Sequence, residues 1–155
     1  MKYIKIILVI LISMLLTSAA KGRIYKTEIY LADKSSLSLS PVRQAIYASC
    51  PGDLCKKTLD RLILNQGIAG TLSVVPPDVK ISVVGSSAYV DFSGHPDFNN
   101  DHNRELLTIY SLVNSLTSSG DIITVKFTLN GKTVKDFGGK VNMTEAFVPD
   151  YDICS

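Results

Sequence analysis

Two histidines and two aspartates fall within one short polar stretch of the chain, where they could bind a metal ion. His95, Asp97, Asp101 and His102 lie in the segment GHPDFNNDH, and imidazole with carboxylate groups is a reasonable ligand set for a metal. However, the spacing matches no zinc or calcium template, and polar loops before a capped helix are common. The metal site, with His95 and His102 as its weak candidate ligands, is therefore the alternative prediction, and no cofactor is expected.

A second set of polar side chains lies on a predicted strand. Tyr89 and Asp91 alternate with the apolar Val90 and Phe92, so they face the opposite side of the sheet. The Asp91 carboxylate either hydrogen-bonds the loop that follows or contacts a partner or ligand. Ser93 stands outside any Gly-x-Ser-x-Gly pattern and is not a nucleophile elbow. We take Tyr89, Asp91 and Ser93 as candidate interaction residues and predict no catalytic residue.

Tyrosines at outward strand positions offer a further surface for contacts. Tyr30, Tyr47 and Tyr89 are expected to be exposed, and tyrosine suits partly wet interfaces. Ordinary exposed aromatic residues are the alternative interpretation.

The cysteines favour a structural role over a redox one. Cys50 and Cys55 flank the turn Pro51–Leu54 and are the candidate disulfide pair, while Cys154 could reach either of them. The spacing Cys-x-x-Cys of redox motifs is absent.

The first 20 residues have the pattern of a signal peptide. Lys2 and Lys5 precede the apolar run Ile6–Leu16, and Ser18 and Ala20 are the small residues expected before cleavage at Lys21. An uncleaved anchor is the alternative, although the run is shorter than the roughly 20 apolar residues of a spanning helix. We therefore expect an exported protein, either periplasmic or otherwise extracytoplasmic, or held at the membrane by this segment alone.

The composition indicates one folded domain. The distribution of charged residues gives no reason to expect binding to nucleic acid. Of the 155 residues, 46% are hydrophobic, which is enough for a core. The 16 basic residues include Lys2 and Lys5, and the other 14 balance the 14 acidic residues. No basic stripe with interleaved aromatic residues is present.

Alternating apolar residues predict strands at 25–31 and 37–47, and Pro41 in the second of these suits an edge strand. The same alternation predicts strands at 79–83 and 88–92, which form a hairpin that turns at Gly85. A further strand is expected at 123–129, with Asn130-Gly131 turning it into a returning strand at 132–137. Helical spacing predicts one helix from an Asp53 cap to Gln66, ended by Gly67, and another from about Asp101 to Leu116.

These elements favour an α+β fold. The expected architecture is a mixed β-sheet of about four to six strands, with the two amphipathic helices packed on one face. A single domain should cover residues 25–148, followed by a C-terminal tail at 149–155.

Several motifs in order resemble the GerMN domain of sporulation and spore-germination proteins. The resemblance covers Thr27 to Phe147 and rests on six pieces: the Leu-rich helix end Leu59–Leu64, the stretch Gly70–Lys80 with Pro76-Pro77, the tetrapeptide Val90–Ser93, the helix motif Val113–Thr117 with Ser115 where threonine is usual, the strand Val125–Lys132 with its glycine turn, and the closing segment Gly139–Phe147.

The resemblance implies a non-enzymatic module of the bacterial envelope with a fold similar to ring-building domains, which associate side by side. Its partners would be envelope proteins or peptidoglycan, together with self-association, in the assembly of envelope or sporulation-type complexes. Many relatives are lipoproteins or carry two copies of the domain, whereas this chain shows one copy and no lipid-attachment cysteine. A periplasmic ligand- or metal-binding protein, or a small enzyme, using the His95–His102 loop is the alternative function.

Overall fold

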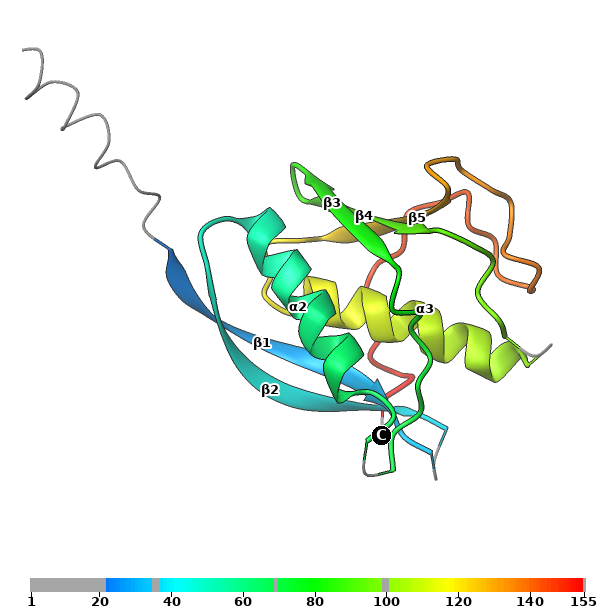
Figure 1. Cartoon of the computed structure of the whole chain (residues 1–155), viewed down its shortest axis with the longest axis horizontal. Coiled ribbons are helices and arrows are strands. Elements are labelled where there is room, and N and C mark those ends of the chain that lie inside the picture. Colours follow the sequence, from blue (N-terminus) through cyan, green and yellow to red (C-terminus); the bar gives the residue numbers. More distant parts are fainter. Residues whose placement is uncertain (1–21, 35–36, 69, 99–100, 155) are drawn as a thin grey trace, which may run out of the picture.

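The protein folds into two small β-sheets with two helices, as a computed structural model describing residues 22–34, 37–68, 70–98 and 101–154 shows (Figure 1). The first sheet pairs β1 (Arg23–Ala32) with β2 (Leu39–Ala48), and the second has the order β3 (Lys80–Val84), β4 (Ser87–Phe92), β5 (Thr124–Leu129). The α+β fold and the mixed sheet are confirmed, but the strands divide between two sheets and do not join in one. The proposed signal peptide lies outside the described residues, and no described helix has the length and apolar character to cross a bilayer.

The β3–β4 hairpin was predicted correctly. The strands are antiparallel, with Ile81 opposite Val90 and Val83 opposite Ala88. Gly85 has a φ of 60°, which glycine adopts without the steric cost that a Cβ brings. Ala88, Val90 and Phe92 are buried, so this face of the hairpin is directed into the core.

The predicted return strand at Lys132–Phe137 is wrong. Asn130 and Gly131 do turn, with φ values of 51° and 74°, but the pairing stops after one bridge between Leu129 and Lys132. Two contacts compete with it. The edge of β5 is occupied at Val125, which exchanges backbone hydrogen bonds of 2.9 and 2.8 Å with Phe147, and Phe137 is buried in the core.

Instead, β5 pairs in parallel with β4 through the crossover that contains α3 (His102–Thr117). Asp101 caps this helix, as its position predicts, by accepting a bond from Asn103 N at 2.9 Å. The other helix, α2 (Pro51–Asn65), is capped by Cys50 and not by Asp53 as predicted. Since Pro51 suits the first helical position, α2 begins three residues earlier than expected.

The two helices lie in the layer between the two sheets and contact both of them (Figure 1). The inner faces of the sheets and the apolar faces of the helices form one main core. Its largest members that are shielded from solvent include Ile29 and Leu39 of the first sheet, Leu62 of α2, Leu112 of α3 and Phe127 of the second sheet. Burying such side chains contributes roughly 1.5–3 kcal/mol each.

A row of serines on α3 closes the free edge of β1. Ser115 Oγ accepts from Tyr30 N at 2.8 Å, and Ser111 Oγ donates to Tyr30 O at 2.6 Å. One turn further on, Ser118 Oγ accepts from Glu28 N at 3.0 Å. The hydroxyls replace the strand that would otherwise pair here, because a buried strand edge needs partners for its backbone groups.

The last residues of the chain complete the first sheet. The Asn114 side chain donates to Asp150 O at 2.7 Å and accepts from Asp150 N at 3.0 Å, and Leu39 N donates to Ile153 O at 3.1 Å. Tyr151 packs against Tyr30 with ring centroids 5.8 Å apart. This contact corrects one prediction, because Tyr30 is buried and not exposed, whereas Tyr47 is 59% exposed.

Candidate functional site

The outer face of the three-stranded sheet carries two of the three predicted interaction residues. Tyr89 and Asp91 are two residues apart on β4 and therefore share this face. In the register of the sheet, Tyr89 lies between Ser82 of β3 and Lys126 of β5. The helices cover the opposite face, so these side chains are directed away from the core (Figure 1).

Asp91 is anchored to the neighbouring strand and its turn. Its Oδ1 accepts bonds of 2.7 Å from both Thr128 Oγ1 and Gly131 N. The predicted bond to the loop after β4 is not what the structure has, because the turn that Asp91 holds follows β5. The carboxylate is only half-buried, so it keeps a surface that a partner can reach.

A shallow groove of about 450 Å³ runs over this face. Its lining comes from all three strands and the turn, and consists of Lys80, Ile81, Ser82, Val84, Tyr89, Asp91, Thr128 and Gly131. Ser93 lies beyond the end of β4, where its Oγ donates to Asp78 O at 3.1 Å. The groove therefore combines Tyr89 and Asp91 but leaves Ser93 out of its lining.

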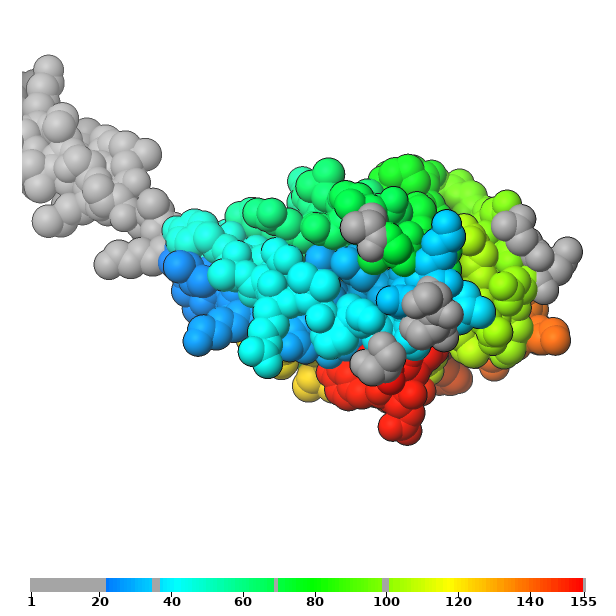
Figure 2. Space-filling view, turned by 90° about the horizontal axis from the view of Figure 1, so that it is seen from below, coloured from blue at the N-terminus to red at the C-terminus, as the bar shows by residue number. Residues whose placement is uncertain are grey.

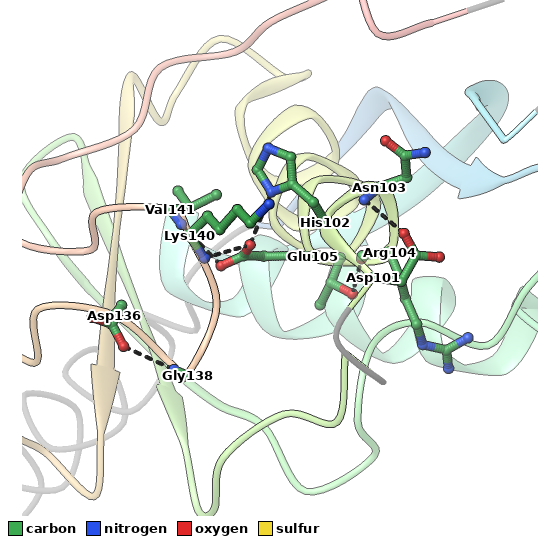
Figure 3. A network of polar contacts seen from close by, with 10 residues as sticks. Asp101, His102, Asn103, Arg104, Glu105, Asp136, Gly138, Lys140 and Val141 are labelled. Atoms are coloured by element: carbon green, nitrogen blue, oxygen red, sulfur yellow. Dashed lines mark hydrogen bonds and ion pairs between the residues drawn. The ribbon is translucent and has the colours of Figure 1, made fainter.

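The first turn of α3 contains the other polar cluster (Figure 3). Glu105 is buried and its carboxylate accepts from Lys140 N at 2.9 Å, from Val141 N at 3.1 Å and contacts His102 Nδ1 at 3.1 Å. The loop passes so close that a Cβ on Gly139 would lie 2.0 Å from Glu105 Oε1. Glu105 thus fixes the path of the 138–141 segment.

The hydrogen bonds outweigh the cost of burying this charge. Burial by itself raises the pKa of Glu105, but the amides of Lys140 and Val141 and the neighbouring His102 favour the ionised form. The net result is a pKa below the usual value for a glutamate. Glu105 is therefore a charged group of the folded state whose acceptor capacity is used within the protein.

Among its described residues, the His95–His102 loop does not bring the candidate ligands together. His95 is exposed, His102 is directed to Glu105, and Asp101 caps α3. Across the described residues, no three or more His, Cys, Asp or Glu side chains are grouped so as to hold a metal ion. Asp97, Asp101, His102 and Glu105 do line a hollow of about 450 Å³ beside Gly138–Lys140.

The predicted pairing of Cys50 with Cys55 is wrong, because all three cysteines are free. Cys50 lies at the helix cap, where its Sγ accepts from Asp53 N at 3.4 Å, while Cys55 is buried on the inner side of α2. Burial raises the pKa of the Cys55 thiol to about 11, which makes it unreactive. Cys154 is near Asn114, with 3.8 Å between its Sγ and Nδ2.

Sequence reasoning missed Glu105, Asn114 and the serine row. Glu105 is an acidic residue in the first turn of α3, which suits the helix dipole, but this signal does not indicate the remote loop that it binds. Ser111 and Ser115 on α3 and Ser118 at its C-cap recur at one-turn spacing, which is a signal for a polar stripe along one side of the helix.

Comparison with known proteins places the fold among solved GerMN structures. The first GerMN domain of the sporulation protein GerM from Bacillus subtilis matches with a TM-score of 0.58 at 24% identity, over 79% of this chain and 96% of that one. The tandem GerMN domains of the same protein match with a TM-score of 0.54 at 19% identity, over 81% of this chain and 46% of that one. A protein from Clostridium perfringens, described as a candidate lipoprotein, matches with a TM-score of 0.57 at 16% identity, over 84% and 89% of the two chains.

No curated protein matches the chain at a significant level. The family comparison is decisive, since the model of the family described as Germane, sporulation and spore germination, matches residues 28–135, which is more than half of the chain. This chain belongs to the Germane (GerMN domain) family.

Proposed function

We propose that the protein is an exported, non-catalytic interaction module of the cell envelope. It binds envelope proteins or peptidoglycan and acts in the assembly of envelope or sporulation-type complexes. The observation that carries this proposal is the outer face of the β3–β4–β5 sheet, where Tyr89 and Asp91 share a shallow groove on the side away from the helices. Membership of the Germane family supports it, as do the sporulation protein and the candidate lipoprotein among the structural matches.

The chemistry of the groove suits binding better than catalysis. Tyr89 offers an aromatic face with a polar hydroxyl, and Lys80, Lys126 and Asp91 surround it with charges of both signs. Such a mixed surface is typical of partner recognition. Asp91 is held in place by Thr128 and Gly131, so it loses little conformational entropy when it binds.

Site-specific crosslinking in intact cells tests this proposal. A photoreactive phenylalanine analogue replaces Tyr89 in one strain and the exposed Lys56 of α2 in a control strain. We expect a discrete conjugate with an envelope protein, or with peptidoglycan, from position 89 but not from position 56. Asp91→Asn in the same chain should weaken the conjugate. Equal labelling from both positions, or none from position 89, would contradict the proposal.

The envelope location is tested separately at the N-terminus. Lys2, Lys5 and the apolar run Ile6–Leu16 motivate it. Intact-mass measurement of the protein from fractionated cells should show either a chain beginning at Lys21 outside the cytoplasm or a full-length chain in the membrane fraction. A full-length chain in the soluble cytoplasmic fraction would contradict export.

A further inference from the structure

The backbone groups along the two edges of the first sheet differ in their partners, and part of the β2 edge is open. In β1 the backbone groups of Glu28 and Tyr30 are directed to the serines of α3. The residues between them, such as Ile29, must therefore direct their groups to β2. Because Ile29 is opposite Val42, the even-numbered residues of β2 face β1 and the odd-numbered residues face outward.

Outward-facing groups at both ends of β2 already have partners. Leu39 N donates to Ile153 O, and Tyr47 O accepts from Lys57 Nζ at 2.8 Å. Pro41 has no backbone N–H group that could donate a hydrogen bond. Between these points, the outward backbone groups of Arg43 and Ala45 have no hydrogen-bond partner within the described part of the chain. Figure 2 shows β2 (cyan) at the surface of the molecule on this side.

The surface beside this open edge is self-complementary. A groove of about 570 Å³ lies between β2 and α2, lined by Ala45, Ile46, Tyr47, Lys57, Asp60, Arg61 and Leu64. Leu64 and Tyr47 are 68% and 59% exposed, and Asp60 and Arg61 present opposite charges next to each other. A patch that carries apolar groups and both charges can bind a second copy of itself across a two-fold axis.

We propose that the protein forms a two-fold dimer by antiparallel pairing of β2 with β2 of a second copy, centred on Ala45. This register places Ala45 opposite its own copy and Arg43 opposite Tyr47 of the second copy. All of these residues face outward, so the Ala45 pair exchanges both backbone hydrogen bonds, and each Arg43 O accepts from Tyr47 N of the second copy while Tyr47 O keeps its bond from Lys57. The small Ala45 side chain removes any clash at the axis, and the two first sheets become one four-stranded sheet.

The partner side chains fit the same arrangement. The Arg43 side chain is 93% exposed, so it can stack on the Tyr47 ring of the second copy. The two α2 helices lie on the same face of the joined sheet, and the axis brings Asp60 of one near Arg61 of the other. Tyr89 and Asp91 lie on the other sheet, so this dimer is independent of the proposed partner face.

A charge-swap experiment tests the dimer. Sedimentation equilibrium of the exported part of the chain should show an apparent mass that rises toward twice that of the monomer with concentration. Ala45→Glu and Ala45→Lys each place like charges across the axis, and each should raise the dissociation constant at least about tenfold. Mixing the two variants should restore the dimer, because the charges are then opposite.

Two further measurements keep the result interpretable. Thermal unfolding of each variant checks that it folds, and restoration by mixing requires folded chains in any case. Thr133→Glu, at an exposed position outside both proposed surfaces, is the matched control and should leave the dimer intact. A wild-type chain that stays monomeric, single variants that still dimerise, a mixture that does not, or a loss of dimer in Thr133→Glu would each overturn the proposal. The crosslinking result at Tyr89 would stand in every case.

Discussion

Two carboxylates hold the C-terminal third of the chain, and their surroundings give them different roles. Glu105 is buried and binds the amides of Lys140 and Val141 as well as His102. Asp91 is half-exposed and binds Thr128 and Gly131 through a single oxygen. A carboxylate whose acceptors are used inside the protein serves the fold, whereas one with a free surface can serve the fold and a partner together.

The largest effect should come from removing the buried carboxylate. Glu105→Ala removes a buried carboxylate and leaves two part-buried backbone amides without their acceptor, which we expect to lower the free energy of unfolding by about 2–4 kcal/mol. Urea denaturation followed by circular dichroism measures this change. The exposed Glu145→Ala is the control and should stay within about 0.5 kcal/mol of wild type. Similar values for the two variants would remove the distinction between the carboxylates.

Adding a Cβ atom where Gly139 approaches Glu105 should lower the free energy of unfolding by a somewhat smaller amount. Gly139→Ala places a Cβ 2.0 Å from Glu105 Oε1, so the loop or the carboxylate must move. We expect a loss of about 1–3 kcal/mol in the free energy of unfolding. Gly94→Ala is the matched control, because a Cβ there meets no atom within 4 Å, and its stability should be nearly unchanged. A tolerated Gly139→Ala would show that Glu105 does not fix this loop.

The pH dependence of the free energy of unfolding should reflect the ionisation of Glu105. Its pKa in the folded state is below the unfolded value, so its contribution is complete above the unfolded pKa, near 4.3, and is lost as the pH falls through the folded pKa. Wild type should therefore lose stability on acidification more steeply than Glu105→Gln. Midpoints of urea unfolding at a series of pH values measure this difference, and parallel curves would contradict it.

The smallest stability effect, and the largest effect on binding, should come from Asp91. Asp91→Ala removes two hydrogen bonds at a half-exposed site, and we expect a loss of about 1 kcal/mol. The same change should abolish crosslinking from the Tyr89 position. If Asp91→Ala instead destabilised the chain as much as Glu105→Ala, Asp91 would be a structural residue like Glu105.

The sequence predicts the parts of this fold that local patterns determine. The alternation in β1, the hairpin at Gly85 and the Asp101 cap of α3 each depend on a few neighbouring residues. The same logic placed Tyr89 and Asp91 on one outward face, where the structure has them.

The features that were missed depend on residues far apart in the chain. The prediction of a return strand was wrong because Phe147 occupies the edge of β5 at Val125. The prediction of an exposed Tyr30 was wrong because Tyr151 packs against its ring. Glu105 is bound by amides 35 and 36 residues away, and α3 serines serve a strand 85 residues earlier. Neither periodicity nor spacing carries information about such pairings.

Asn114 ties the end of the chain to its first sheet, and this has a consequence for the order of folding. The amide of Asn114 and the backbone of Leu39 gain their partners only when Asp150 and Ile153 have been synthesised. Contacts of such high sequence separation slow folding, because chain entropy is lost before they form. The domain can therefore become fully native only after the chain has been made as far as Ile153, so an earlier intermediate still lacks these partners of α3 and β2.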